Sequence, residues 1–203
     1  VNAARVSFAR ESNEFDERDE RLIKFLAREG HTSPFRHAMA TFEVKAPLMV
    51  ARQWWKYVVG SDHTMDGWNE VSRRYVDERP EFYIPDVWRA APDNRKQGSG
   101  GPVDQATSLE AKKVLEHVCE DAIANYKMAL IHGICAEQAR LFLPAYAMYT
   151  TWRWTASLQS ICHFLNQRLA SDAQWEIREY AKAVEHLIRP KFPMSVAALL
   201  GGV

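Results

Sequence analysis

Four short segments of the chain carry side chains that could do chemistry. In the first, Arg52, Gln53 and Lys56 lie beside three aromatic residues, and a spacing of four puts Arg52 and Lys56 on one helix face. The second, residues 69–75, holds a carboxylate, a hydroxyl and two guanidiniums. A guanidinium presents a planar fork of N–H donors that suits the oxygens of a phosphate. Each segment could equally be a solvated helix face or an exposed strand edge.

The other two segments place polar groups among apolar residues. Arg140 stands in the run Ala-Arg-Leu-Phe-Leu-Pro of residues 139–144, and a buried guanidinium is costly unless it is paired or holds a ligand. Residues 157–168 have an amphipathic pattern whose polar face carries amides, His163 and Arg168. A lone histidine in such a helix is more often a satisfied core residue than a functional one.

The common nucleotide-binding and catalytic motifs are absent from the sequence. There is no G-x-G-x-x-G, P-loop, H-E-x-x-H or G-x-S-x-G pattern, and only nine glycines occur. No metal site is predicted. If the protein binds a nucleotide, its side chains must do most of the holding.

The elements that position these groups follow from hydrophobic periodicity and from turn residues. Capping boxes at Thr107-x-x-Glu110 and Ser171-x-x-Gln174 are predicted to begin two long helices. The predicted helices cover residues 16–29, 49–59, 107–130, 136–141, a segment ending at 168, and 171–189; extended segments cover 40–44, 69–75, 81–84 and 149–154; surface loops cover 60–67 and 89–106. This mixture predicts one α+β domain over residues 1–203, with a helical layer against a small antiparallel sheet.

Composition excludes several classes of protein. Twenty-six basic and twenty-six acidic residues give zero formal charge, whereas non-specific nucleic-acid binding needs a basic surplus. The longest apolar run, residues 46–51, is far short of the roughly 20 residues of a membrane span. Three scattered cysteines without a C-x-x-C pair indicate a reduced, cytoplasmic protein.

A series of short motifs runs through nearly the whole chain. They are residues 4–7 (Ala-Arg-Val-Ser), 31–37 (His-x-Ser-Pro-Phe-x-His), 45–47 (Lys-Ala-Pro), 51–54 (Ala-Arg-Gln-Trp), 69–75 (Asn-Glu-x-Ser-x-Arg-Tyr), 139–144 (Ala-Arg-x-x-Leu-Pro), 163–168 (His-Phe-Leu-x-x-Arg) and 173–177 (Ala-Gln-x-Glu-Ile). In this order the set resembles the flavin-dependent thymidylate synthases. The resemblance implies their α/β fold and a homotetramer whose active sites are shared between subunits.

The resemblance also implies an activity and roles for single residues. The expected reaction is FAD-dependent methylation at C5 of a uracil nucleotide, dUMP or UMP, with methylenetetrahydrofolate as carbon donor, NADPH as reductant and no attacking cysteine. Arg168 matches the arginine that activates the uracil ring. The positions matching nucleotide contacts are Gln53, Lys56, Glu70, Val71, Ser72, Arg73, Arg74, Arg140 and Arg168. Those matching flavin contacts are His31, Ser33, Lys56, Tyr57, Val58, Glu70, Ser157, Gln159 and His163.

The sequence departs from the family pattern mainly at flavin positions. Lys56-Tyr57-Val58 stands where the family has Arg-His-Arg, and the segment before Asn69 is about six residues longer. The family's Asn-x-Arg is Ser157-Leu-Gln159 here, and its next Asn is His163. We expect the longer loop to close over the bound nucleotide and flavin. Three hypotheses follow: a UMP/dUMP methylase resembling the antibiotic-pathway members, an ordinary dUMP-specific thymidylate synthase, and a nucleotide-binding homologue without turnover.

Overall fold

The computed structural model describes residues 1–57, 68–70, 79–92 and 98–201. The chain forms two compact units. Unit 1 consists of Val1–Phe42, Lys56–Gly67 and Trp154–Val203, and unit 2 consists of Glu43–Trp55 and Trp68–Arg153. Of the described helices, none combines the length and the apolar character that crossing a bilayer requires.

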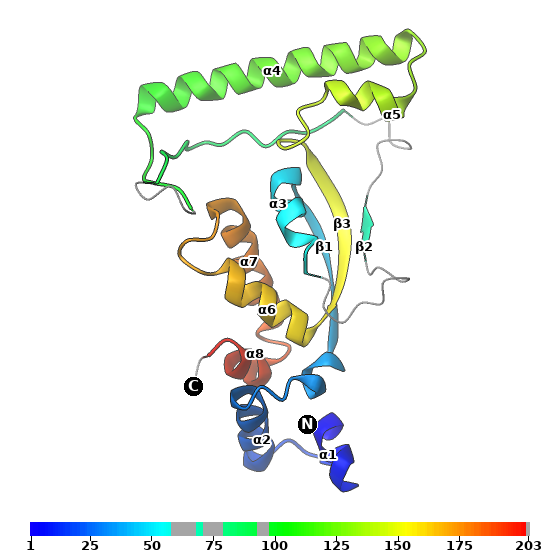
Figure 1. Ribbon diagram of the computed structural model, residues 1–203, viewed down its shortest axis with the longest axis vertical. Coiled ribbons are helices and arrows are strands. Elements are labelled where there is room, and N and C mark those ends of the chain that lie inside the picture. The colour runs from blue at the N-terminus through cyan, green and yellow to red at the C-terminus, as the bar shows by residue number, and fades with distance from the viewer. Residues whose placement is uncertain (58–67, 71–78, 93–97, 202–203) are drawn as a thin grey trace. The chain divides into compact units, whose positions relative to one another are not determined.

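The strands form a three-stranded sheet in the order β1-β3-β2, with β1 at Met39–Pro47, β3 at Tyr149–Ser157 and β2 at Trp68–Glu70 (Figure 1). In unit 1 the hydroxyls of Thr41 and Thr155 are hydrogen-bonded at 2.9 Å, and in unit 2 Arg153 pairs with Glu43 at 3.1 Å. Residue numbers therefore rise along one strand as they fall along the other, so β1 and β3 are antiparallel. The small antiparallel sheet expected from the sequence is confirmed.

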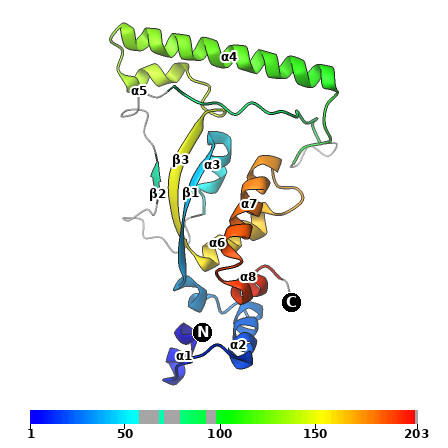
Figure 2. The ribbon, with the colours of Figure 1, turned by 180° about the vertical axis from the view of Figure 1, so that it is seen from behind.

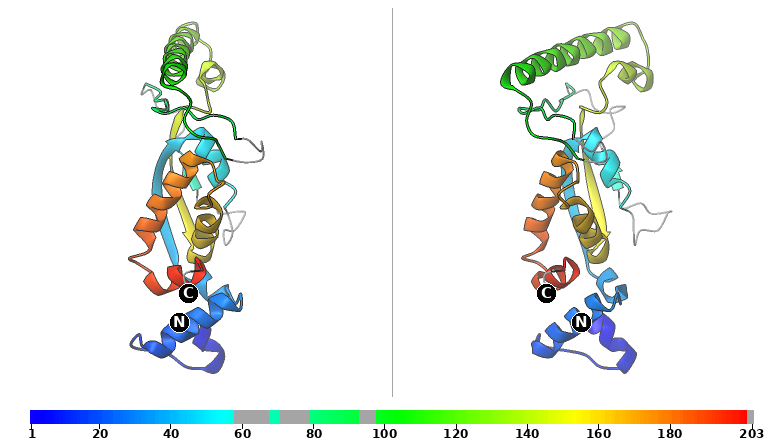
Figure 3. Two further views of the ribbon diagram at one scale, coloured as in Figure 1. Left: turned by 90° about the vertical axis from the view of Figure 1, so that its left-hand side faces the viewer. Right: turned by 60° about the vertical axis from the view of Figure 1, so that its left-hand side comes forward.

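Helices make up most of unit 1: α1 (Asn2–Arg5), α2 (Glu17–Arg28), α6 (Leu158–Arg168), α7 (Trp175–Ile188) and α8 (Pro193–Leu199), with the short 3₁₀ turns η1 (Val6–Phe8) and η2 (Ser33–Arg36). α6 packs on α7, and α2 packs on α8 (Figure 3). The inward faces of α6 and α7 meet through buried apolar side chains such as Ile161, Leu165, Ile177 and Ala181. α6 is thereby held as a rigid support for the polar residues at its ends.

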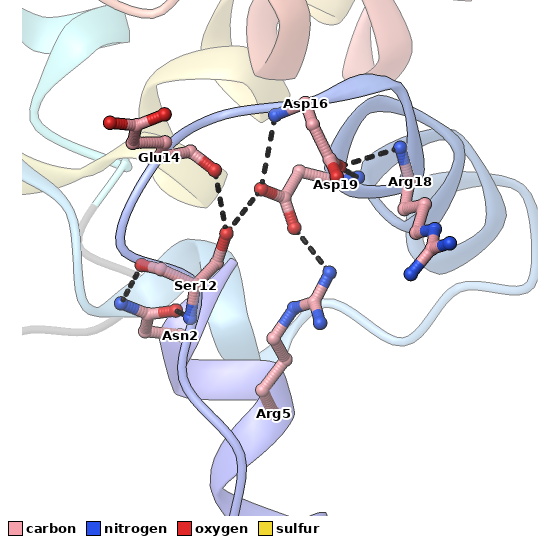
Figure 4. Close-up of polar contacts among 7 residues, drawn as sticks. All are labelled: Asn2, Arg5, Ser12, Glu14, Asp16, Arg18 and Asp19. Carbon is pink, nitrogen blue, oxygen red and sulfur yellow. Dashed lines mark hydrogen bonds and ion pairs between the residues drawn. The ribbon is translucent and has the colours of Figure 1, made fainter.

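The start of α2 is fixed by a network of charged and polar groups (Figure 4). Asp16 caps the helix and forms a capping box with Asp19. Asp19 is 1% exposed, accepts a 2.6 Å hydrogen bond from the Ser12 hydroxyl and pairs with Arg5. These contacts tie the first segment of unit 1 to α2. The helix ends where Gly30 takes a positive φ of 68°, the left-handed conformation that glycine adopts without strain.

Unit 2 contains α3 (Leu48–Trp54), α4 (Gln105–Ile131), α5 (Ala136–Ala139) and the turn η3 (Arg140–Phe142). α4 packs on α5 and η3, which lie alongside it (Figure 2). Tyr126, Ala129, Ala139 and Leu143 form the core between them.

Several predicted element boundaries were wrong for local reasons. α4 begins at Gln105 rather than Thr107, because Asp104 is the cap and accepts from the Thr107 N–H at 2.9 Å. α7 begins at Trp175, and its cap residue Gln174 makes no side-chain capping bond. Ser171 instead accepts, through its carbonyl, a bond from Arg178. The helix predicted to run to residue 59 ends at Trp54, and α8 was not predicted.

Candidate active site

In unit 1, α6 contains three of the predicted site residues, Gln159, His163 and Arg168, and a fourth, Ser157, is its cap residue. Ser157 caps the helix, and its hydroxyl accepts a 3.2 Å hydrogen bond from the Ser160 N–H. Ser157 is 1% exposed, so its side chain serves the helix start. At the other end, Phe164 and Arg168 are four residues apart and therefore share one face. That face packs against Tyr57.

Tyr57 lies inside a cluster of rings in unit 1. Its side chain is 7% exposed. Its ring meets Phe164 edge-on at 5.1 Å between centroids and His163 at 5.7 Å. The Cζ atom of Arg168 lies 5.4 Å from the centroid of the Tyr57 ring, within the range of a cation–π contact. The Tyr57 carbonyl accepts a 3.4 Å hydrogen bond from Nε1 of Trp154, which fixes its backbone as well.

Arg168 lies on an aromatic ring and has no counter-ion among the described residues. Its Nε atom is buried and has no hydrogen-bond partner within the described parts of the chain. The side chain is half-buried, and none of the described carboxylates pairs with it. A guanidinium held on an aromatic face without a counter-ion can stabilise negative charge on a bound ligand. Among the residues that the structure places, this is the arrangement best suited to polarising a ring.

A second guanidinium lies at the start of α6. Arg36, at the end of η2, donates through Nε to the side-chain oxygen of Gln159. The Leu158 N–H donates to the Ala38 carbonyl at 2.8 Å, so η2 and α6 are joined by the backbone too. Arg36 is exposed and offers its remaining N–H groups outward. Arg36 was not predicted as a site residue, because it occupies an unmatched position within the 31–37 motif. The available signal was an arginine inside a segment whose other positions mostly match.

His31, Ser33 and Lys56, the other flavin-site residues that the structure describes in unit 1, are exposed. His31 meets the ring of Phe25 edge-on at 6.1 Å, and Ser33 begins η2. Lys56 follows the end of α3 and is exposed. The expectation that Arg52 and Lys56 share a helix face was wrong, because the helix ends at Trp54 before it reaches Lys56.

Three of the predicted nucleotide-site residues lie among the described residues of unit 2. Gln53 donates to the Met49 carbonyl at 3.3 Å. Glu70 is the last residue of β2. Arg140 was expected to be buried among apolar residues, and this was wrong: it is exposed and its Nε donates to the Glu137 carbonyl at 3.3 Å. The short turn η3 directs it outward, while Ala139 and Leu143 are buried instead. Val58, Val71, Ser72, Arg73, Arg74 and the 60–67 loop lie outside the described residues.

The cysteines are unsuited to nucleophilic attack where the structure buries them. Burial raises the pKa of the Cys162 thiol to about 12, so it carries no thiolate near neutral pH. Burial also raises the pKa of Cys119. All three cysteines are free, and Cys135 in unit 2 is exposed.

Comparison with known proteins gives consistent matches. Residues 1–194 match the family model described as "Thymidylate synthase complementing protein". The chain is 38% identical over 200 residues to a flavin-dependent thymidylate synthase of Thermosipho africanus, covering 98% of this chain and 84% of that protein. It is 39% identical over 198 residues to the enzyme of the same name from Thermus thermophilus, covering 98% and 69%.

Crystal structures of the UMP/dUMP methylase PolB from Streptomyces cacaoi are similar in fold. The complex with 5-Br dUMP superposes with a TM-score of 0.83 and 29% identity, covering 99% of this chain and 88% of that one. The complex with 5-Br UMP gives a TM-score of 0.80 at 27% identity, covering 97% and 87%. The chain therefore belongs to the flavin-dependent thymidylate synthase family, and it is an FAD-dependent methyltransferase that acts at C5 of uracil.

Proposed function

We propose that this protein methylates C5 of dUMP, UMP or both, with methylenetetrahydrofolate as carbon donor and NADPH as the source of electrons. The observation that carries the proposal is Arg168, a cation without a described counter-ion on the face of Tyr57. The similarity to a methylase crystallised with analogues of both nucleotides supports either sugar. The residues from 1 to 203 act as one domain in this proposal.

The reaction needs electron density at a weakly nucleophilic carbon. Arg168 stabilises negative charge at the N3–O2 edge of the uracil ring, which raises the electron density at C5. The methylene carbon gains a bond to C5 and a hydride as its two bonds to folate nitrogens break, and C5 loses its proton. The products are the methylated nucleotide and tetrahydrofolate. Bound FAD, once reduced, supplies the hydride. Because the pKa of the Cys162 thiol is about 12, this cysteine of α6 does not attack the ring.

The residues of unit 1 fit a large anionic cofactor. Arg36 presents an exposed guanidinium that the side chain of Gln159 holds in place. We assign FAD binding to this region, through Arg36 together with His31, Ser33, Lys56, Val58, Ser157, Gln159 and His163. Glu70 belongs to unit 2 and keeps the flavin role that the family resemblance implies. Arg36 replaces the arginine that the family pattern has where this chain has Gln159. The Ser157 hydroxyl already serves as the α6 cap, so its contribution comes from its backbone.

A second set of residues is assigned to the nucleotide, and several of them act from a neighbouring subunit. The set consists of Gln53, Lys56, Glu70, Val71, Ser72, Arg73, Arg74 and Arg140, whose guanidiniums bind the phosphate. Arg140 suits such a role, because its exposed side chain is free to reach a ligand outside its own subunit. α4 exposes apolar side chains at Val114, Val118 and Met128, and a homotetramer would cover them.

A product assay tests the proposal. Purified protein is first checked for FAD by its absorbance, and then supplied with methylenetetrahydrofolate, NADPH and either dUMP or UMP. We expect a product heavier by one methylene group. A product from dUMP alone identifies an ordinary thymidylate synthase, and nucleotide binding without product identifies a homologue without turnover.

A further inference from the structure

The ring beneath Arg168 is an unusual feature of this chain. In the family the position of Tyr57 holds a histidine, which can itself carry a positive charge, whereas the phenol ring of tyrosine is neutral at ordinary pH. The structure encloses this ring between the backbone link from Trp154 and the α6 residues Phe164 and Arg168. Its 7% exposure leaves little surface for a ligand.

The contacts of the ring and those of the hydroxyl differ. The π face of Tyr57 lies under the Arg168 guanidinium. The ring also makes a T-shaped contact with Phe164 and a tilted one with His163. Within the described part of the chain no hydrogen bond involves the Tyr57 hydroxyl. The aromatic face is therefore the part of the side chain that acts on Arg168.

A flat aromatic face restricts how a guanidinium can lie. Arginine is planar and stacks on aromatic rings, and the ring quadrupole attracts its charge. No described carboxylate competes for Arg168, so the Tyr57 face is the described group that orients it. A donor aimed before the reaction begins stabilises developing charge without reorganising at that moment.

We propose that Tyr57 is a positioning residue, which holds the Arg168 guanidinium in the orientation that polarises the uracil ring. This inference rests on the proposed function of Arg168. It assigns the tyrosine side chain to the substrate-activating arginine rather than to a contact with the flavin. It also explains how the chain tolerates losing the family's histidine, since a neutral ring supports the adjacent arginine without repelling it.

Paired variants of the full-length, FAD-loaded protein test the inference. Tyr57→Phe keeps the ring, whereas Tyr57→Leu removes the π face. We expect Tyr57→Phe to retain kcat within about twofold, and Tyr57→Leu to lower kcat by about 5- to 30-fold, the range that loss of one cation–π contact gives. The dissociation constant for dUMP, measured by calorimetry, should change less than kcat. A misoriented Arg168 guanidinium mainly loses stabilisation of the transition state and loses less binding energy to the ground-state nucleotide.

Two controls separate positioning from structural damage. Phe42→Leu removes another ring of the same cluster, one that stacks on Trp154 at 5.6 Å, whereas the ring under Arg168 is that of Tyr57. It should lower the melting temperature without lowering kcat. Tyr57→Met serves as the second ring-free variant if the leucine variant folds poorly.

The outcomes are distinguishable. Equal losses in Tyr57→Phe and Tyr57→Leu would overturn the inference, because the hydroxyl would then be the active part. Full kcat in both ring-free variants would overturn it too, and so would loss of bound FAD in Tyr57→Leu with unchanged dUMP affinity. A wild-type protein without turnover contradicts the proposed function instead; Tyr57 is then judged from dUMP affinity, which must fall in Tyr57→Leu and not in Tyr57→Phe.

Discussion

At the scale of single residues, two arginines of unit 1 carry the proposed chemistry, and their contacts differ from those of the paired arginines. Arg5, Arg79 and Arg189 are each paired with a carboxylate. Arg168 differs, since it lies on an aromatic ring and has no paired carboxylate in the described structure. Arg36 differs too, because its described partner is the neutral amide of Gln159. These two side chains are therefore the clearest places to test the site.

Arg168→Ala removes the donor that stabilises charge on the uracil ring. We expect turnover to fall by about 10²–10³, the usual cost of one transition-state donor, while FAD stays bound. Steady-state kinetics and the absorbance of the purified variant measure the two effects. Turnover near that of the wild type would show that another group activates the ring.

Arg36→Ala tests whether this arginine takes over from the missing one at position 159. We expect FAD affinity to fall by about tenfold, the cost of a partly exposed charged hydrogen bond. The decisive control is the double variant Arg36→Ala with Gln159→Arg, which restores the family's residue on α6 and should recover affinity. Fluorescence titration of the apoprotein with FAD measures both, and an unrecovered double variant argues against the exchange.

At the scale of elements, sequence patterns predicted the long helices and the strand before α6, but they misplaced several helix ends. The helix ending at Arg168 and the strand before it were predicted, because the alternating burial of β3 and the amphipathic face of α6 are local patterns. The Tyr57–Arg168 contact joins residues far apart in sequence, so no local pattern could have indicated it. The cap of α4 was misplaced because Thr107 and Asp104 both suit a cap, and their mutual hydrogen bond decides in favour of Asp104.

Asp19 gives the start of α2 a pH dependence. The hydrogen bond from Ser12 and the pairing with Arg5 hold the pKa of Asp19 below its usual value. Since a lowered folded-state pKa favours the ionised native form, this stabilisation is complete above the unfolded value near 3.8 and is lost as the pH falls through the lower folded value.

Asp19→Asn should therefore lower the free energy of unfolding at pH 7 and flatten its decline as the pH falls below about 3.8. Urea unfolding at several pH values measures this. Asp121→Asn is the matched control, because the Asp121 side chain is 64% exposed and lies outside this network. If both variants show the same acid profile, Asp19 does not set it.

At the scale of the whole molecule, the proposed active site depends on the proposed homotetramer, because neighbouring subunits would contribute residues to it. α4 buries Cys119, Ala122 and Tyr126 and still exposes Val114 and Val118, which share a face one turn apart. A helix with apolar residues on two faces is expected where a second copy of the chain covers the outer one. Hydrophobic periodicity cannot identify such a surface from the sequence, because it does not distinguish a core face from a subunit interface.

The double variant Val114→Glu with Val118→Glu tests this assembly. We expect a smaller particle in light scattering coupled to size exclusion, together with a loss of turnover, because the sites are proposed to draw residues from neighbouring subunits. Ala124→Glu places one glutamate at an exposed position on another face of α4 and should leave the particle size unchanged. Full activity in a dissociated double variant would contradict the shared site.

Release of tritium from the C5 position tests the central claim most directly, because methylation at C5 must expel that hydrogen whatever the fate of the other atoms. FAD-loaded protein is incubated with C5-tritiated dUMP or UMP in the presence of methylenetetrahydrofolate and NADPH. We expect tritium to enter the solvent from at least one nucleotide, in an amount matching the methylated product, and only when both co-substrates are present. Protein that holds FAD and nucleotide yet releases no tritium from either substrate would contradict the account.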